Sequence, residues 1–215
     1  MSCAICQTRR PRRHCPGIRG EICAICCGAS REVSVDCPLD CPYLQEARKH
    51  EKTPEPDPER MPNPDVEITE RFLEDHAQLL TLTCQALVGI ALSTAGVIDS
   101  DVRDALDALA RTYRTLESGL IYETRPANLV AAGLQQRLRA ELDRLRTEMK
   151  EQLGMETVRD TDILGVVVML QRMEFTRSNG RARGRAFIDF LRQEFPAPDA
   201  ASPIDTGDSD LIVPA

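Results

Sequence analysis

The sequence contains no tryptophan, three histidines, and aromatic residues at only 4% of its 215 positions. Any hydrophobic core must therefore be aliphatic, and the hydrophobic fraction of 42% is large enough to form one. The histidines, His14, His50 and His76, are scattered, and no Ser-His-acid set or H-E-x-x-H string can be assembled. We therefore expect a protein that is not an enzyme; a helical enzyme of unrecognised type ranks third among the functions considered.

Long apolar runs and a secretion signal are also lacking. No window approaches the roughly 20 apolar residues that a membrane-spanning helix requires. The longest apolar run, residues 163–170, is typical of a buried helix, and the N-terminus MSCAICQTRR has no apolar segment of the kind found in signal peptides. We expect a cytoplasmic protein that has no membrane partner.

Charge is distributed unevenly, although the formal net charge is −7. Residues 1–50 carry eight Lys/Arg against five Asp/Glu, whereas residues 51–76 carry three against nine. Residues 77–195 are balanced, and the last twenty residues hold four Asp and no base. The acidic excess thus belongs to a linker and a tail that we expect to be disordered, and it says little about a partner of the folded parts.

Cysteine is concentrated at the N-terminus, where eight of the nine cysteines fall within 41 residues. Two pairs have C-x2-C spacing, which lets a tight turn place two thiolates on one tetrahedral zinc ion. A third pair, in DCPLDCPYL, has C-x3-C spacing and precedes a short helix that begins near Tyr43. The predicted metal ligands are Cys3, Cys6, Cys15, Cys23, Cys26, Cys27, Cys37 and Cys41.

Eight thiolates suit two zinc ions in a cross-braced arrangement. We assign Cys3, Cys6, Cys23 and Cys26 to the first ion and Cys15, Cys27, Cys37 and Cys41 to the second, and His14 is an alternative ligand at the second. A disulfide framework is the main competitor, but disulfides are typical of secreted chains. Iron–sulfur ligation and redox-sensing thiols share the same C-x2-C spacing and remain open.

A segment of about 40 residues with few apolar side chains needs metal or crosslinks to fold. Zinc held by four thiolates has no open coordination position, so the predicted sites are structural. The run ICAICCGASREVSVDCPLDCPYLQEAR resembles a cysteine-rich module of uncharacterised bacterial proteins, with the pattern C-x2-C-C-G followed by C-P-x-x-C-x-Y-L. Its ligand spacing also resembles that of cross-braced B-box and RING zinc fingers; the likeness is one of ligand order, and it implies nothing about activity.

Two arginine-rich stretches are candidates for contact with nucleic acid. The first lies inside the cysteine-rich segment, and the second is TRSNGRARGR, where glycine gives the chain flexibility. The alternative is that the first cluster offsets the negative charge of the thiolates, because no aromatic residue alternates with it to stack on bases. The arginines concerned are Arg9, Arg10, Arg12, Arg13, Arg181, Arg183 and Arg185.

The rest of the chain has helical periodicity. A proline-rich stretch, EKTPEPDPERMPNPD, is expected to be an unpacked spacer, and five helices with apolar stripes should follow it. The second stripe, from Val102 to Leu120, is typical of a coiled coil and, with the third, leaves room for self-association. Asp99 and the pair Asp160/Asp162 are expected to cap helices.

We therefore predict a mainly α protein with a small binuclear zinc module and a bundle of about five helices. Its four parts are a zinc module (1–48), an acidic linker (49–65), the bundle (66–196) and an acidic tail (197–215).

Three further features have ordinary structural interpretations that we favour. The turn LESGLIYETRPAN (116–128) is expected to be held by Arg–Glu contacts, although it is also a candidate binding site. His76 is expected to be a hydrogen-bonded core residue, and Cys84 a small buried apolar group. The leading functional hypothesis is a zinc-stabilised adaptor that binds proteins; a nucleic-acid-associated regulatory protein is the alternative.

Overall fold

The computed structural model describes residues 2–51, 56–153 and 158–196, so the predicted tail lies outside the described residues. Within these ranges the chain forms eight α-helices and a two-stranded sheet, and the prediction of a mainly α protein is confirmed. None of the helices described is long and apolar enough to span a membrane. The cysteine-rich segment forms β1 (Arg13–Cys15), β2 (Gly20–Ile22), α1 (Ala24–Ser30) and α2 (Pro42–Arg48).

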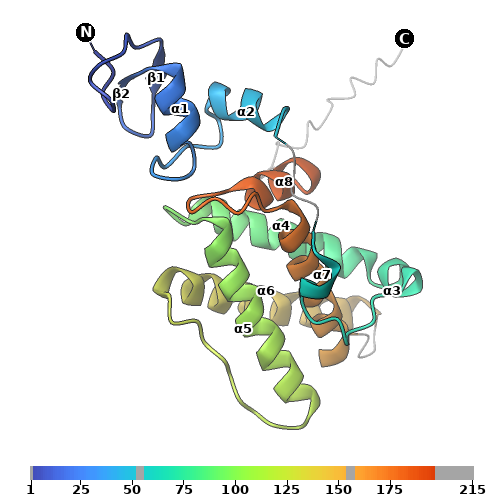
Figure 1. The fold of residues 1–215 in the computed structure, drawn as a ribbon. Helices are drawn as coiled ribbons and strands as arrows, with labels where there is room; N and C mark the ends of the chain where they lie inside the picture. The colour runs from blue at the N-terminus through green and yellow to red at the C-terminus, as the bar shows by residue number, and fades with distance from the viewer. Residues whose placement is uncertain (1, 52–55, 154–157, 197–215) are drawn as a thin grey trace, which may run out of the picture.

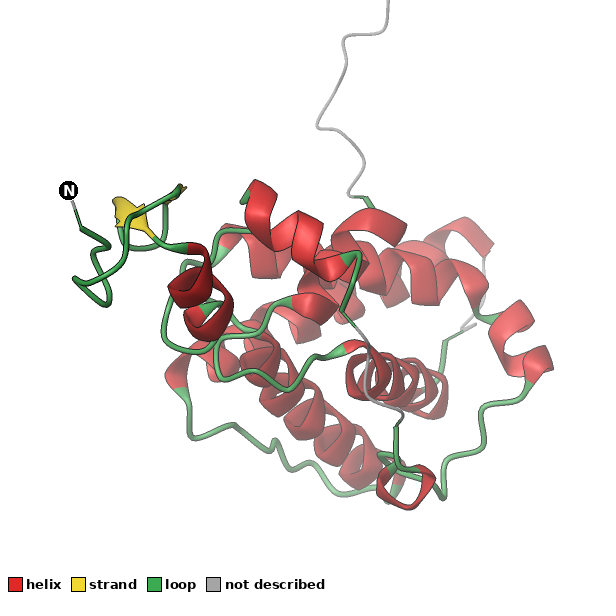
Figure 2. Cartoon of the chain, turned by 45° about the horizontal axis from the view of Figure 1, so that its top comes forward, coloured by secondary structure: helices red, strands yellow, loops and turns green. Residues whose placement is uncertain are grey.

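The remaining elements form a helical body, and the cysteine-rich segment projects from one end of it, beside α8 (Figures 1 and 2). The body holds six helices instead of the expected five, because the segment before Ser93 is split at His76, whose backbone (φ −114°, ψ 15°) is not helical. The elements are η1 (Pro58–Arg60), α3 (Glu70–Asp75), α4 (Ala77–Ser93), α5 (Asp99–Glu117), α6 (Leu129–Leu153), α7 (Asp160–Arg177) and α8 (Ala186–Glu194).

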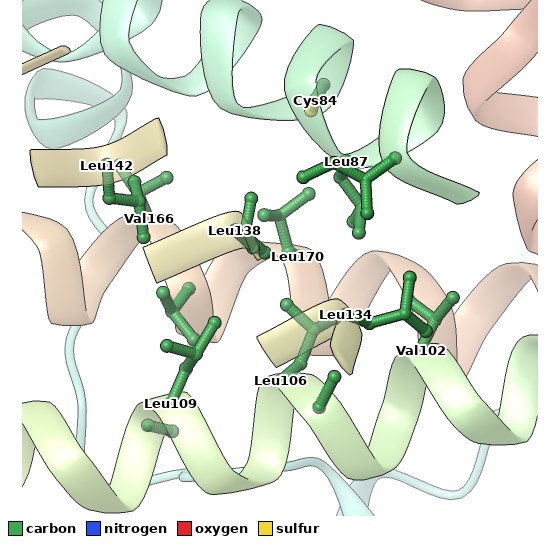
Figure 3. Close-up of a cluster of buried hydrophobic side chains, with 14 of the residues drawn as sticks. Cys84, Leu87, Val102, Leu106, Leu109, Leu134, Leu138, Leu142, Val166 and Leu170 are labelled. Carbon is green, nitrogen blue, oxygen red and sulfur yellow. The ribbon is translucent and has the colours of Figure 1, made fainter. Parts of the chain in front are cut away.

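The core of the body is aliphatic and lies between α4, α5, α6 and α7 (Figure 3). Leu106 of α5, Leu138 of α6 and Leu170 of α7 are fully buried in it. The predicted stripes on α5 and α6 therefore pack for most of their length into the core of the same chain, although Leu129 and Val130 at the start of α6 are exposed; self-association stays a prediction. The second stripe is shorter than expected, because α5 ends at Glu117 and leaves Leu120 63% exposed.

Two buried aspartates at the start of α5 have different partners. The carboxylate of Asp101 accepts a hydrogen bond from the backbone N–H of Ile98 and caps α5 itself. Asp99 was expected to cap this helix, but its carboxylate accepts from the backbone N–H groups of Phe187 and Ile188 in α8, at 3.0 and 3.2 Å. Asp99 thus fixes the start of α8 against α5.

The second half of the proline-rich stretch is packed, so the expectation of an unpacked spacer is wrong for these residues. Arg114 of α5 bonds both carboxylate oxygens of Asp65 and the side-chain oxygen of Asn63. Arg172 of α7 donates to the backbone carbonyls of Pro62, Asn63 and Val66. Two arginines therefore satisfy the polar groups of a segment that has few backbone hydrogen bonds of its own.

Candidate metal centre

The first predicted quartet is brought together at the tip of the cysteine-rich segment. The sulfur atoms of Cys3, Cys6, Cys23 and Cys26 lie within 4.8 Å of one another, and this is the candidate metal-binding group found in the described part of the chain. Sulfurs on a tetrahedral zinc ion lie about 3.8 Å apart, since each Zn–S bond is about 2.3 Å long. The arrangement therefore needs only a small contraction to hold a metal ion.

A repeated CAIC sequence builds this quartet from two similar turns. In the first turn, the backbone N–H of Gln7 donates to the carbonyl of Cys3. In the second, Cys23 is the N-cap of α1, and its sulfur accepts from the backbone N–H of Cys26 at 3.4 Å. The antiparallel hairpin β1–β2 lies between the two turns and brings them side by side, with the backbone N–H of Cys23 donating to the sulfur of Cys3 at 3.2 Å.

The charge states of the thiols favour a cation between them. Hydrogen bonds from Thr8, and then from the backbone N–H of Arg9, lower the pKa of Cys6 to about 5. Burial and the neighbouring thiols raise the pKa of Cys26 to about 12. Four thiols in one small space cannot all ionise without a positive ion among them, whereas a bound metal ion deprotonates its thiol ligands outright.

The second predicted quartet is gathered less tightly. Cys15, Cys37 and Cys41 are each 8% exposed, and Cys27 is half-buried. All four line one small cavity of about 20 Å³. Among the described residues, the four sulfurs of this second quartet do not all lie within 4.8 Å of one another, as those of the first quartet do. His14, the alternative ligand, is exposed and its Nδ1 lies 3.2 Å from a carboxylate oxygen of Glu21.

A close approach at Gly17 joins the hairpin to the loop that precedes Cys37. A β-carbon at Gly17 would lie 2.4 Å from the backbone oxygen of Asp36 and 2.8 Å from the side chain of Val35. Only glycine fits there, because no real β-carbon approaches another atom so closely. The contact holds the turn after Cys15 against the residues that carry Cys37.

Two of the module's arginines contact cysteine sulfurs. The sulfur of Cys23, followed by that of Cys6, raises the pKa of Arg9. The Nη1 atom of Arg13 lies 3.4 Å from the sulfur of Cys27, and its guanidinium lies over the Tyr43 ring at 4.6 Å. Each quartet thus has one arginine beside it, as expected if the positive charge offsets thiolate charge. Arg10 and Arg12 are exposed.

The second arginine-rich stretch lies against the cysteine-rich segment. Glu32 is fully buried, and its carboxylate accepts from Arg48 at 2.8 Å and from Asn179 at 2.9 Å. The same carboxylate accepts from the backbone N–H of Arg185 at 3.0 Å, and the backbone carbonyl of Glu32 accepts from that of Arg183.

Arg181 and Arg185 were predicted to contact nucleic acid, but their side chains bond residues of the cysteine-rich segment and its surroundings. Arg185 bonds the carbonyls of Val97 and Cys37 and pairs with Asp36 at 2.5 Å. Arg181 donates to the carbonyl of Arg31 and pairs with Glu51 at 2.8 Å. Of the three predicted contact residues Arg181, Arg183 and Arg185, Arg183 alone is exposed.

A second buried acid, which sequence reasoning missed, completes this contact. Asp189 of α8 is 2% exposed and accepts from Arg48 and, at 2.7 Å, from Arg192. Gln45 donates to the same carboxylate at 3.3 Å. Glu32, Arg48 and Asp189 thus form a row in which one arginine bridges two buried carboxylates. No sequence signal marks the contact of Glu32 with Asn179 and Arg185, or that of Asp189 with Arg48, because these partners lie 141 to 153 positions away.

The other predicted features have ordinary surroundings. His76 stacks on Phe72 at 4.3 Å and its Nδ1 lies 2.9 Å from the Phe72 carbonyl oxygen, so it is hydrogen-bonded as predicted, but it is half-buried and not a core residue. Cys84 is fully buried, and burial raises its pKa to about 12. In the loop after α5, Glu123 pairs with Arg125 at 3.1 Å and Arg139 at 3.3 Å, as predicted for a turn held by Arg–Glu contacts.

A large groove lies between α5, α7 and residues 56–63 of the helical body, with a volume of about 700 Å³. Its buried polar groups are already paired: Arg103 bonds both oxygens of Glu174, and Gln171 donates to Asp107. Its lining shows no nucleophile beside a general base.

Comparison with known proteins gives no relative. No family model matches the chain, no curated protein matches it, and no solved structure matches its fold. The class that the fold and the cysteine geometry define is a mainly α protein whose N-terminal segment carries a four-cysteine site that could hold a metal ion.

Proposed function

We propose that this protein is a non-catalytic interaction protein, an adaptor, whose N-terminal module is folded around two zinc ions. The observation that carries the proposal is the cluster of four sulfurs within 4.8 Å at Cys3, Cys6, Cys23 and Cys26. A metal ion with four thiolate ligands has no position for water or substrate, so its task is to hold a surface in shape.

The second ion is assigned to Cys15, Cys27, Cys37 and Cys41. The support is that these four cysteines, from separate parts of the segment, line a single cavity of about 20 Å³ beside Arg13. A void of this size accommodates roughly one water-sized particle, and buried thiols are poor partners for water. Closing the quartet on zinc would require its sulfurs to move closer together.

Metal analysis of the purified protein tests this proposal. Protein prepared without chelator should carry two zinc ions per chain by plasma mass spectrometry. Cys23→Ser and Cys37→Ser should each lose one ion, whereas Cys84→Ser, the same change at a buried cysteine outside the module, should lose none. Bound iron, or paired disulfides without metal, would contradict the proposal and indicate a redox function for the cysteines instead.

An adaptor needs exposed contact residues, and two groups of apolar side chains are candidates. Ile5 and Ile25 occupy the same position in the two CAIC turns and are 39% and 62% exposed. Leu120, Ile121 and Tyr122 form a consecutive apolar stretch that is 63%, 96% and 66% exposed. Contiguous apolar exposure, unlike single residues, is typical of interaction sites.

A crosslinking experiment tests the adaptor function. A photo-crosslinking residue at position 25 or 121 should give one discrete adduct in cells. Ile25→Asp or Ile121→Asp should abolish binding of the partner that is crosslinked at that position, without changing the zinc content. The matched control is position 92, where Leu92 is also exposed, at 51%. Adducts that are equally abundant at position 92 would count against specific binding.

Nucleic-acid binding is the second candidate, and Arg10 and Arg12 support it best because both are exposed. Binding through phosphate contacts should weaken steeply as salt rises. The double variant Arg10→Ala/Arg12→Ala should lower both affinity and salt dependence. Affinity for nucleic acid that does not depend on salt, or that survives this change, would exclude the proposal.

A further inference from the structure

The cysteine-rich module contacts the helical body through one part of its sequence. Among the residues that the structure describes, the polar contacts between the two come from residues 31–51, and none comes from residues 2–30. We call residues 31–48 the docking segment and residues 178–185 the receptor loop. Leu39 of the docking segment also packs against the core of the body.

The second cysteine quartet surrounds the docking segment. Cys27, in α1, and Cys37 flank the part of the sequence that carries Glu32, and Cys41 is the N-cap residue of α2, which carries Gln45 and Arg48. The backbone carbonyl of Cys37 itself accepts a hydrogen bond from Arg185. The first quartet has no such position, because its last ligand, Cys26, precedes the segment.

The loop conformation needs support from outside the loop. Glu32 has a φ of +51°, in the left-handed region that a residue with a side chain rarely adopts. Such a conformation persists only where the surroundings fix it. Joining Cys27 and Cys37 through one ion would close this loop and reduce the number of conformations that compete with the docked one.

We propose that metal binding at the second quartet controls the docking of the module on the helical body. This inference rests on the proposed function, since it requires the second zinc ion. With the ion bound, residues 31–36 present the Glu32 carboxylate to Asn179 and Arg185, and α2 presents Arg48 to Asp189. Without the ion, the docking segment separates from the receptor loop, while the first quartet keeps its own ion.

Paired variants of the full chain test the proposal. Cys37→Ser/Cys41→Ser should raise the hydrogen-exchange rates of the Arg183 and Arg185 amides, which donate to Glu32, by roughly tenfold or more. Trypsin should then cut within the receptor loop. Cys3→Ser/Cys6→Ser is the matched control, with two serines in the other quartet, and both amides should keep their protection.

A third variant separates docking from metal binding. Glu32→Ala should keep two zinc ions per chain and still lose protection of the same amides. If the Cys37→Ser/Cys41→Ser protein fails to fold, zinc can instead be removed stepwise from the wild-type protein with a chelator, and amide protection measured after each step. The ion that leaves from the second quartet is identified by chelating Cys3→Ser/Cys6→Ser, which retains only that ion. The helical signal of the body, read by circular dichroism, verifies folding in each case.

The failures are distinguishable. Protein without zinc would overturn the proposed function and this inference together. Two zinc ions, with unchanged amide protection in Cys37→Ser/Cys41→Ser, would overturn only the inference. Equal loss of protection in Cys3→Ser/Cys6→Ser would also overturn it, because docking would then depend on the module as a whole.

Discussion

Replacing Asp99 by asparagine should change how the stability of the helical body depends on pH. Asp99 is 2% exposed and lies beneath the receptor loop, since its backbone N–H donates to the carbonyl of Gly184 at 2.8 Å. Burial raises its pKa from the ordinary 3.8 to about 7; hydrogen bonds from Phe187 and Ile188 oppose this rise and only partly offset it.

The sign of the effect follows from proton binding in the two states. Between about pH 4 and pH 7 the folded protein keeps a proton on Asp99 that the unfolded chain has lost. The contribution of Asp99 to the free energy of unfolding therefore falls as pH rises through this window and is constant above it. One pKa unit corresponds to about 1.4 kcal/mol, and Asp99 is half ionised at about pH 7, so the change from pH 5 to pH 7 is about 2 kcal/mol.

Urea unfolding of wild type and Asp99→Asn at several pH values between 5 and 8 measures this contribution. The stability of the variant relative to wild type should rise by about 2 kcal/mol between pH 5 and pH 7 and level off near about pH 8. Taking the difference at each pH removes contributions common to both proteins, including those of the cysteines. Asp104→Asn, at an exposed position of α5, is the matched control. A difference that does not vary with pH, or that falls as pH rises, would show that the α8 hydrogen bonds outweigh burial.

Three further changes have specific expected results. Leu106→Ala, in the fully buried core, should cost about 2–5 kcal/mol in urea unfolding, whereas Leu129→Ala, 87% exposed, should cost less than about 0.5 kcal/mol; equal costs would contradict the core assignment. Gly17→Ala should make one of two zinc ions easier to remove by chelator, and unchanged release of both would refute the close approach. Arg114→Ala should speed hydrogen exchange at the Val66 amide by loosening residues 62–66, and unchanged exchange would show that Arg172 suffices.

The helices and the first quartet follow from local patterns in the sequence. The C-x2-C pairs define which sulfurs can meet on one ion, and apolar spacing predicts the buried faces of α5 and α6. These signals act over a few residues, so they are readable without a structure. Two local signals were nevertheless missed: the break at His76, and the end of α5 before Leu120, where Gly119 has a φ of +76°.

Long-range polar pairing was not predictable in the same way. The arginine-rich receptor loop was noticed, but its flexibility and charge favoured contact with an external phosphate. Its partner, Glu32, is one of two acids between Cys27 and Cys37, and nothing near it indicates burial. The packed residues 62–66 were missed for the same reason, because the prolines of the stretch predict an extended chain, whereas Arg114 and Arg172 come from helices far along the sequence.

The pinning of residues 62–66 has a consequence for a module that leaves its docked position. The described residues of the N-terminal part end at Glu51, and the described residues resume at Pro56, shortly before the packed residues 62–66. Five residues span at most about 17 Å when extended. An undocked module therefore stays at a local concentration in the millimolar range around its own receptor loop, where a weak interface is enough to bring it back. A free partner would have to match that concentration to occupy the loop in its place.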